Sequence, residues 1–107
     1  MDLLLAGCDP SRVGLCFDAG WAARAGLDPL VFARTRAEWI GTLHLRDFRG
    51  AASVPLGAGD LDLRGTVPEL LALPRLCAAL VEQDPGGETP EAEMVQSRRL
   101  LCDLLGV

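Results

Sequence analysis

Short apolar runs alternate along this chain with longer segments whose apolar residues recur at helical spacing. The apolar runs predict three strands, at residues 13–17, 42–48 and 76–81. A periodic segment after each run predicts a helix, and the three helices cover residues 28–40, 62–73 and 89–105. Consecutive strand–helix units form parallel strands with helices outside them, so the pattern predicts an α/β fold.

The number of units limits the architecture. Each unit takes roughly 30 residues, as in a (β/α)8 barrel of about 250 residues, so three units fit here and eight do not. An open three-stranded parallel sheet exposes its edges and one whole face. We therefore predict a partial (β/α)8 TIM barrel and expect the 107 residues to be a piece of a larger architecture.

Local signals mark the ends of the helices and the loops. Asp28-Pro29 and Thr89-Pro90 each place a capping side chain before a first-turn proline, and Asp62 is a third candidate cap. Residues 50–59 and 83–88 are rich in turn-forming residues and predict loops.

Two helices have a predicted inner face. The first helix is expected to end at Gly41 and to bury Leu30, Val31, Trp39 and Ile40. The last is expected to stop at Gly106 and to bury Met94, Val95, Leu101, Cys102 and Leu105.

Composition and charge exclude several classes of protein. Half of the residues are hydrophobic and 23% are charged, which excludes extended disorder. The formal net charge is −5, and a chain of this sign lacks the basic patch that attracts phosphate. We therefore expect no nucleic-acid partner and no membrane partner. No stretch approaches the roughly 20 apolar residues of a membrane helix.

The start of the chain and its cysteines favour a cytoplasmic location. Leu5-Ala6-Gly7-Cys8 resembles the end of a lipoprotein leader, but the apolar run before it is short and follows an acidic residue. The four cysteines show no CxxC spacing, and most lie among apolar residues. This pattern favours buried free thiols in a reducing compartment over zinc or disulfide bonds.

Three polar residues interrupt or end the three predicted strands: Asp18, His44 and Glu82. Their spacings of 26 and 38 residues are each about one repeat, so in a parallel barrel all three converge at the C-terminal face, where active sites lie. Such donors suit Mn²⁺, Co²⁺, Mg²⁺ or Zn²⁺. Structural alternatives remain open, because a carboxylate after a strand often caps a helix and a single His is often structural.

Six segments in the same order resemble the xylose-isomerase-like TIM barrel superfamily of sugar phosphate isomerases, epimerases and inosose dehydratases. They are Val13-Gly14-Leu15-Cys16-Phe17-Asp18-Ala19-Gly20, Ala25-Gly26-Leu27-Asp28-Pro29-Leu30, Leu43-His44-Leu45-Arg46-Asp47, Val54-Pro55-Leu56-Gly57-Ala58-Gly59-Asp60-Leu61-Asp62, Leu80-Val81-Glu82-Gln83-Asp84 and Ser97-Arg98-Arg99-Leu100-Leu101. The resemblance implies that residues 1–107 are the C-terminal portion of such a domain, its last three βα units.

The resemblance also implies roles for individual residues. That family binds one divalent metal through Glu, Asp, His and Glu, and Asp18, His44 and Glu82 match the last three of these ligands. Glu82 is in addition the expected catalytic carboxylate. Trp21 occupies the position of a substrate-binding His, where its ring can stack on a sugar face. Arg46 replaces the more usual Lys and is the second expected substrate-binding residue, with a simple surface ion pair as the alternative.

These implications define the functional expectations. The first is the C-terminal fragment of a metal-dependent sugar (phosphate) isomerase or epimerase-like protein that abstracts a proton next to a carbonyl, with weak or absent metal binding and no activity alone. Its substrate would be a sugar, sugar phosphate or inosose, and its partner the missing N-terminal barrel half. The second is a non-catalytic remnant or assembly module that pairs through its open sheet edge, for example as a homo-oligomer. A DNA-repair endonuclease of the same superfamily fits poorly, because the chain is acidic and has a single His.

Overall fold

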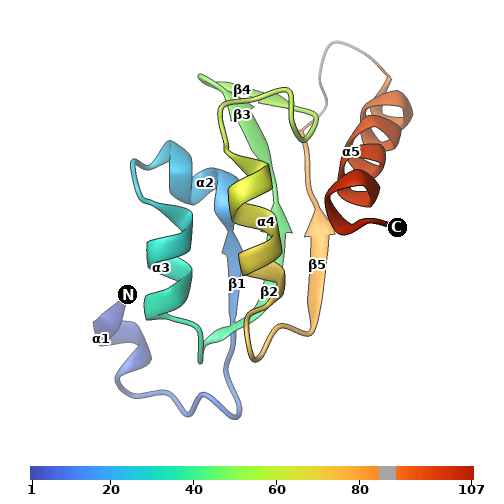
Figure 1. The fold of residues 1–107 in the computed structure, drawn as a ribbon. Coiled ribbons are helices and arrows are strands. Elements are labelled where there is room, and N and C mark those ends of the chain that lie inside the picture. Colours follow the sequence, from blue (N-terminus) through green and yellow to red (C-terminus); the bar gives the residue numbers. More distant parts are fainter. Residues whose placement is uncertain (85–88) are drawn as a thin grey trace.

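The computed structural model describes residues 1–84 and 89–107, so residues 85–88 of the predicted 83–88 loop lie outside the described residues. Its centre is a sheet of three parallel strands in the order β1 (Leu15–Asp18), β2 (Ile40–Leu45) and β5 (Ala78–Val81) (Figure 1). Each strand pairs with the next one along the sheet. The predicted α/β class, with parallel strands as in a partial (β/α)8 barrel, is confirmed.

Helices cover one face of this sheet. Figure 1 shows α2 (Ala19–Arg24), α3 (Pro29–Thr35) and α4 (Leu63–Leu71) in front of the strands, whereas α5 (Pro90–Leu105) lies beside β5. A short helix, α1 (Asp2–Leu5), precedes β1. None of the helices described here combines the length and apolar character needed to cross a membrane.

The alternation of side chains along the strands separates a buried face from an exposed one. Phe17 on β1 aligns with Leu43 on β2, and both are buried under the helices. On the other face, Cys16 aligns with Thr42 and Thr42 with Ala78, and both Cys16 and Ala78 are exposed. In β1 and β2 one face therefore belongs to the core and the other faces solvent. On β5, Ala79, the partner of Leu43, is exposed as well.

The helix starts follow from capping side chains. Asp28 accepts hydrogen bonds from the backbone nitrogens of Leu30 and Val31, at 2.8 and 3.1 Å, and Asp62 accepts from the nitrogen of Gly65 at 3.1 Å. Two of the three predicted caps, Asp28 and Asp62, are therefore confirmed. Thr89 occupies the cap position of α5 without a side-chain hydrogen bond.

The predicted end of the first long helix is wrong. Helix α3 ends at Thr35, and a turn closed by the Trp39 nitrogen and the Arg36 carbonyl follows. Ile40 is fully buried because it belongs to β2 and pairs with β1, and Val31 is 55% exposed. Apolar residues of the predicted helix at 28–40 thus belong partly to helix α3 and partly to strand β2. Helical spacing of apolar residues does not show where the helix ends and the strand begins.

The sequence pattern also missed a β-hairpin. The predicted strand at 42–48 breaks at Arg46, and the chain continues as β3 (Asp47–Arg49), which pairs antiparallel with β4 (Ala52–Val54). Strand β4 lies within the predicted loop at 50–59. Figure 1 shows the hairpin at the end of the sheet toward which the parallel strands point.

The inner face of α5 differs from the predicted one. Met94, Val95 and Leu105 are exposed, whereas Glu93 and Ser97 are buried. Ser97 Oγ accepts a hydrogen bond from the Leu56 nitrogen at 3.1 Å, and Gln83 Nε2 donates to Glu93 Oε2. Polar side chains point inward here because they satisfy backbone and side-chain groups of other segments.

The cysteines are free, as predicted, but they are not buried. Cys16 and Cys77 are exposed, and Cys8 and Cys102 are partly exposed. The apolar neighbours of Cys16 in sequence misled the prediction, because alternate residues of a strand point to opposite faces.

Candidate metal centre

The C-terminal ends of the three parallel strands bring together the three predicted metal ligands. Asp18 is the last residue of β1 and aligns with His44 on β2, while Glu82 directly follows β5. One ligand atom from each of Asp18, His44 and Glu82 can be chosen so that all three atoms lie within 4.8 Å of one another. The convergence expected from parallel strand topology therefore occurs.

Asp18 both ends its strand and starts the following helix. Its Oδ1 accepts a hydrogen bond from the Trp21 nitrogen at 2.9 Å, which caps α2. Its Oδ2 lies 3.2 Å from Arg46 Nε. Asp18 therefore does cap a helix, which was the structural alternative, through Oδ1. Its other oxygen, Oδ2, faces Arg46.

His44 and Glu82 contact each other directly. His44 Nδ1 contacts Glu82 Oε2, and both side chains are partly exposed. The other Glu82 oxygen, Oε1, lies 2.7 Å from Arg46 Nη2. Imidazole and carboxylate are therefore adjacent and open to solvent, as a ligand or a proton-transfer pair requires.

Arg46 lies at the centre of this cluster. Its side chain is only 4% exposed, and its three nitrogens contact Asp18, Glu82 and Asp84, the last through Nη1 and Oδ2 at 2.9 Å. Burial by itself lowers the pKa of Arg46, but Asp84 and Asp18 outweigh burial and raise that pKa above its usual value. Arg46 is therefore a fixed positive charge among three carboxylates.

A close approach of two backbone segments makes this burial possible. Gly20, in the first turn of α2, lies against Arg46, and a Cβ on Gly20 would fall 2.5 Å from the Arg46 carbonyl oxygen. A residue with a side chain would push α2 away from β2. Glycine at this position thus lets Asp18 and Arg46 meet.

Aromatic rings flank the cluster on one side. Trp21 is 47% exposed and packs edge-on against Phe48, with ring centroids 4.9 Å apart. The Arg46 guanidinium carbon lies 5.8 Å from each ring centroid, and the Arg24 guanidinium carbon lies 4.9 Å from each. Trp21 is therefore beside the predicted ligands, with part of its side chain open to solvent.

Asp84 is the member of the cluster that sequence reasoning did not single out. Besides its contact with Arg46, its backbone nitrogen donates to Ser53 Oγ at 3.1 Å, which ties the hairpin strand β4 to the site. The available signal was its position two residues after Glu82, but its partner Arg46 is 38 residues away (84 − 46 = 38).

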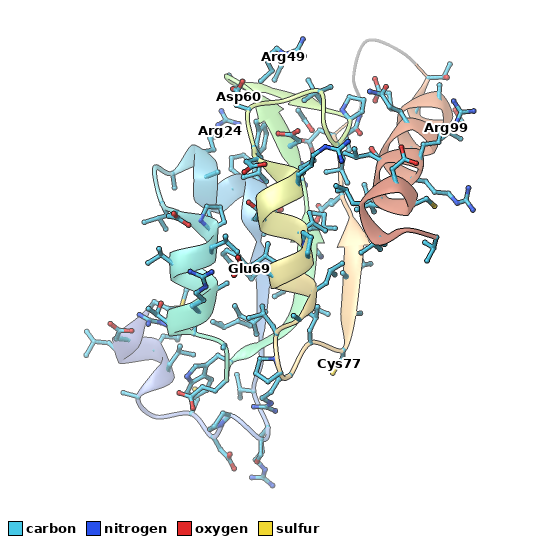
Figure 2. All side chains as sticks on the ribbon, in the orientation of Figure 1. Arg24, Arg49, Asp60, Glu69, Cys77 and Arg99 are labelled. Carbon is cyan, nitrogen blue, oxygen red and sulfur yellow. The ribbon has the colours of Figure 1, made fainter. Side chains whose placement is uncertain are left out.

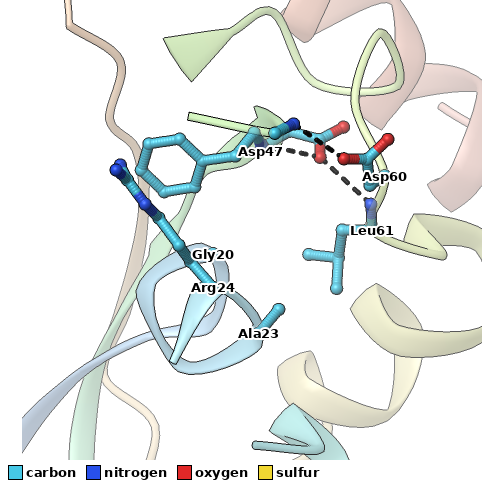
Figure 3. Close-up of a pocket in the computed structure, with 8 residues that line it drawn as sticks. Gly20, Ala23, Arg24, Asp47, Asp60 and Leu61 are labelled. Carbon is cyan, nitrogen blue, oxygen red and sulfur yellow. Dashed lines mark hydrogen bonds between the residues drawn. The ribbon is translucent and has the colours of Figure 1, made fainter. Parts of the chain in front are cut away.

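A separate pocket of about 210 Å³ is lined by residues of α2, of the hairpin and of the loop at Asp60 and Leu61 (Figure 3). Asp47 lines it and is fully buried, and its carboxylate accepts hydrogen bonds from four backbone nitrogens, those of Phe48, Gly57, Gly59 and Leu61. A Cβ on Gly59 would clash with this carboxylate. Because of these hydrogen bonds we assign to Asp47 the role of supporting the glycine loop. Asp18, His44 and Glu82 are not among the residues that line the pocket.

The donor set fits a divalent metal. One imidazole nitrogen and two carboxylates are hard-to-borderline ligands, and three protein ligands leave room for substrate oxygens. Each carboxylate oxygen has more than one lone pair, so its contact with Arg46 or His44 does not exhaust its capacity. Asp18, His44 and Glu82 are therefore the residues that would hold the ion.

Two solved structures, both from Parabacteroides distasonis ATCC 8503, share this fold. A sugar phosphate isomerase/epimerase superposes with a TM-score of 0.78 at 20% sequence identity, over 94% of this chain and 33% of that chain. A second sugar phosphate isomerase/epimerase superposes with a TM-score of 0.75 at 24% identity, over 94% and 34%. No protein-family model matches the chain, and no curated protein is significantly similar to it. The chain spans about a third of the length of these proteins and has the α/β fold of that part of a sugar phosphate isomerase/epimerase.

Proposed function

We propose that this chain is the C-terminal portion of a divalent-metal-dependent sugar or sugar-phosphate isomerase or epimerase-like protein. The observation that carries the proposal is the convergence of Asp18, His44 and Glu82 at the ends of three parallel strands. The names of the two structural neighbours support a carbohydrate substrate. The proposed metal is Mn²⁺, Co²⁺, Mg²⁺ or Zn²⁺.

The proposed chemistry is proton abstraction from a carbon next to a carbonyl. A bound divalent ion would polarise the oxygens of the substrate and so ease the loss of that proton. Glu82 is the proposed base, because its partly exposed carboxylate lies beside an imidazole at the open face of the sheet. Trp21 is the proposed platform for the sugar, since its half-exposed ring borders the same cluster.

Arg46 was predicted to bind substrate, and that role stays a prediction. Its nitrogens already face three carboxylates, and its side chain is buried. A substrate anion would have to reach Arg46 past these partners, whereas Trp21 and Glu82 are open to solvent.

Metal titration of the chain tests this function. We expect weak but saturable Mn²⁺ binding by calorimetry, weakened at least about tenfold by Asp18→Asn, His44→Gln or Glu82→Gln. Asp60→Asn is the matched control, because it removes the same charge from an exposed carboxylate outside the cluster. Equal loss in the control, or no loss in the three variants, would contradict the proposal.

The chemistry has its own assay. Incubation of the chain with D-fructose or D-fructose 6-phosphate in deuterated water reports proton exchange at the carbons next to the carbonyl by NMR. The chain spans a third of its structural neighbours, so we expect little exchange without the other barrel strands. Adding a polypeptide that supplies those strands is expected to raise the exchange rate, and Glu82→Gln to abolish the rise.

A second candidate function is assembly through the open sheet. Strands β1 and β5 are the two edges of the three-stranded sheet. Beside β1 lies an apolar cavity of about 320 Å³ lined by Leu15, Phe17, Leu27 and Phe32, among others. An edge strand next to apolar surface favours pairing with another chain. Light scattering would show an oligomer that Leu27→Lys dissociates, and a monomer at all concentrations would exclude this function.

A further inference from the structure

Three carboxylates share one buried cation in this structure. Asp18, Glu82 and Asp84 each place an oxygen within 3.2 Å of a different nitrogen of Arg46. Asp18 lies at the end of β1, and Glu82 and Asp84 follow the end of β5. Asp18 is at least 64 residues away in sequence from the other two acids (82 − 18 = 64). Without a cation between them, like charges at this separation would repel and open the site.

The guanidinium is also held from the side. Trp21 and Phe48 place their rings 5.8 Å from its carbon, and Gly20 gives α2 the close approach that covers it. A planar group with its donors in a fixed fork suits several carboxylates at once, which a single ammonium does not. Arg46 is therefore oriented by its surroundings toward the ligand carboxylates.

We propose that Arg46 is the resident counter-ion of the Asp18–His44–Glu82 set, a positioning residue that holds the ligand carboxylates together when no metal is bound. Its single positive charge offsets part of the negative charge of the three carboxylates, and its contacts hold Asp18 and Glu82, two of the three ligands, at the ends of their strands. One buried side chain therefore contacts both ligand carboxylates, Asp18 through Nε and Glu82 through Nη2.

This role has a consequence for metal binding, and that part rests on the proposed function. A cation that binds the same carboxylates lies near the positive charge of Arg46, and two cations repel. Removal of Arg46 is expected to destabilise the metal-free chain and, at the same time, to make the chain depend more strongly on the metal. A residue that only bound substrate would produce neither effect.

Thermal unfolding with EDTA and with Mn²⁺ tests the proposal in the full chain. In EDTA, Arg46→Met is expected to lower the unfolding midpoint by about 10 °C or more, because it leaves the carboxylates without their cation. Arg24→Met is the matched control: Arg24 contacts the same two rings but has no ion pair with Asp18, Glu82 or Asp84 among the described residues. We expect a much smaller shift for it.

Charge compensation separates this role from simple packing. The double variant Arg46→Met/Glu82→Gln, with one carboxylate fewer, is expected to recover at least half of the lost midpoint. Mn²⁺ is expected to raise the midpoint of Arg46→Met at least twice as much as that of the unmodified chain. If Arg46→Met does not fold, Arg46→Lys provides the comparison, since it keeps the charge and is expected to lose less.

The outcomes distinguish the two proposals. A midpoint for Arg46→Met equal to that of Arg24→Met, or no recovery in the double variant, would overturn the counter-ion role. If Arg46→Met does not fold, failure of Arg46→Met/Glu82→Gln to fold as well would overturn it, because one carboxylate fewer is expected to restore folding. If Glu82→Gln rescues Arg46→Met in EDTA but no variant responds to Mn²⁺, the counter-ion role is supported and the proposed metal site fails.

Discussion

At the scale of single residues, two buried charged side chains organise the region around the site. Arg46 contacts the carboxylates of Asp18, Glu82 and Asp84. The carboxylate of its neighbour Asp47 accepts hydrogen bonds from backbone nitrogens of the glycine loop. Arg46 lies at the break between β2 and β3 and Asp47 opens β3, and their side chains have different partners. One faces the candidate metal centre and the other holds the loop behind it.

Asp47→Asn tests the loop support. The amide keeps the shape but offers only one acceptor oxygen to the four nitrogens that the carboxylate now satisfies. We expect a loss of about 1–3 kcal/mol in the free energy of unfolding, measured with urea. The matched control is Asp60→Asn, whose exposed carboxylate accepts from a single nitrogen, that of Gly50. Equal losses in the two variants would argue against the role of Asp47.

The residue types of the candidate site were predictable, but most of their contacts were not. Asp18, His44 and Glu82 were found because each ends or interrupts an apolar run, which is a local signal. Their closeness follows from parallel strands, which repeating units predict. The triple contact of Arg46 depends on Asp84 and on Gly20, which no local pattern connects to position 46.

At the scale of helices and strands, caps were easier to predict than inner faces. Asp28 and Asp62 cap their helices as expected, because capping involves backbone groups only two or three residues away. The inner face of α5 was predicted only in part: Leu101 packs against the core, but Glu93 and Ser97 are buried through partners on other segments. Figure 2 shows this helix with its many polar side chains, among them Arg99, at the edge of the molecule.

Ser97→Ala tests how α5 is attached. Ser97 is fully buried, and its loss leaves the buried Leu56 nitrogen without its acceptor. We expect a loss of about 1–3 kcal/mol in the free energy of unfolding. Ser53→Ala is the control, because Ser53 accepts from the exposed Asp84 nitrogen, which water can satisfy. A smaller loss for Ser97→Ala than for Ser53→Ala would contradict this attachment of α5.

At the scale of the whole molecule, the sheet is covered on one face and open on the other. Figure 1 shows the helices α2, α3 and α4 in front of the strands, and Cys16 and Leu80 are exposed on the opposite face. The predicted ligands belong to that same exposed face. In a closed barrel this face would point inward.

Cysteine labelling measures the exposure of this face. Exposed thiols react with iodoacetamide faster than covered ones, other factors being equal. We expect Cys16 and Cys77 to be labelled before Cys8 and Cys102. Mass spectrometry of digested samples taken at successive times measures the labelling of each cysteine. Protection of Cys16 alone as protein concentration rises would indicate that a second copy covers the face, whereas equal rates for all four would contradict the exposed surface described above.

Local patterns were sufficient to predict the approximate positions of the three parallel strands and the caps Asp28 and Asp62, because each depends on neighbours within a few residues. They also singled out Asp18, His44 and Glu82 as candidate ligands. The repeat of strand and helix was sufficient to predict parallel pairing and hence the edge where the ligands meet. The hairpin at 47–54, the inward polar face of α5 and the partners of Arg46 required the folded chain. They depend on contacts between segments tens of residues apart, where the geometry of packing selects the partner and local pattern carries no signal.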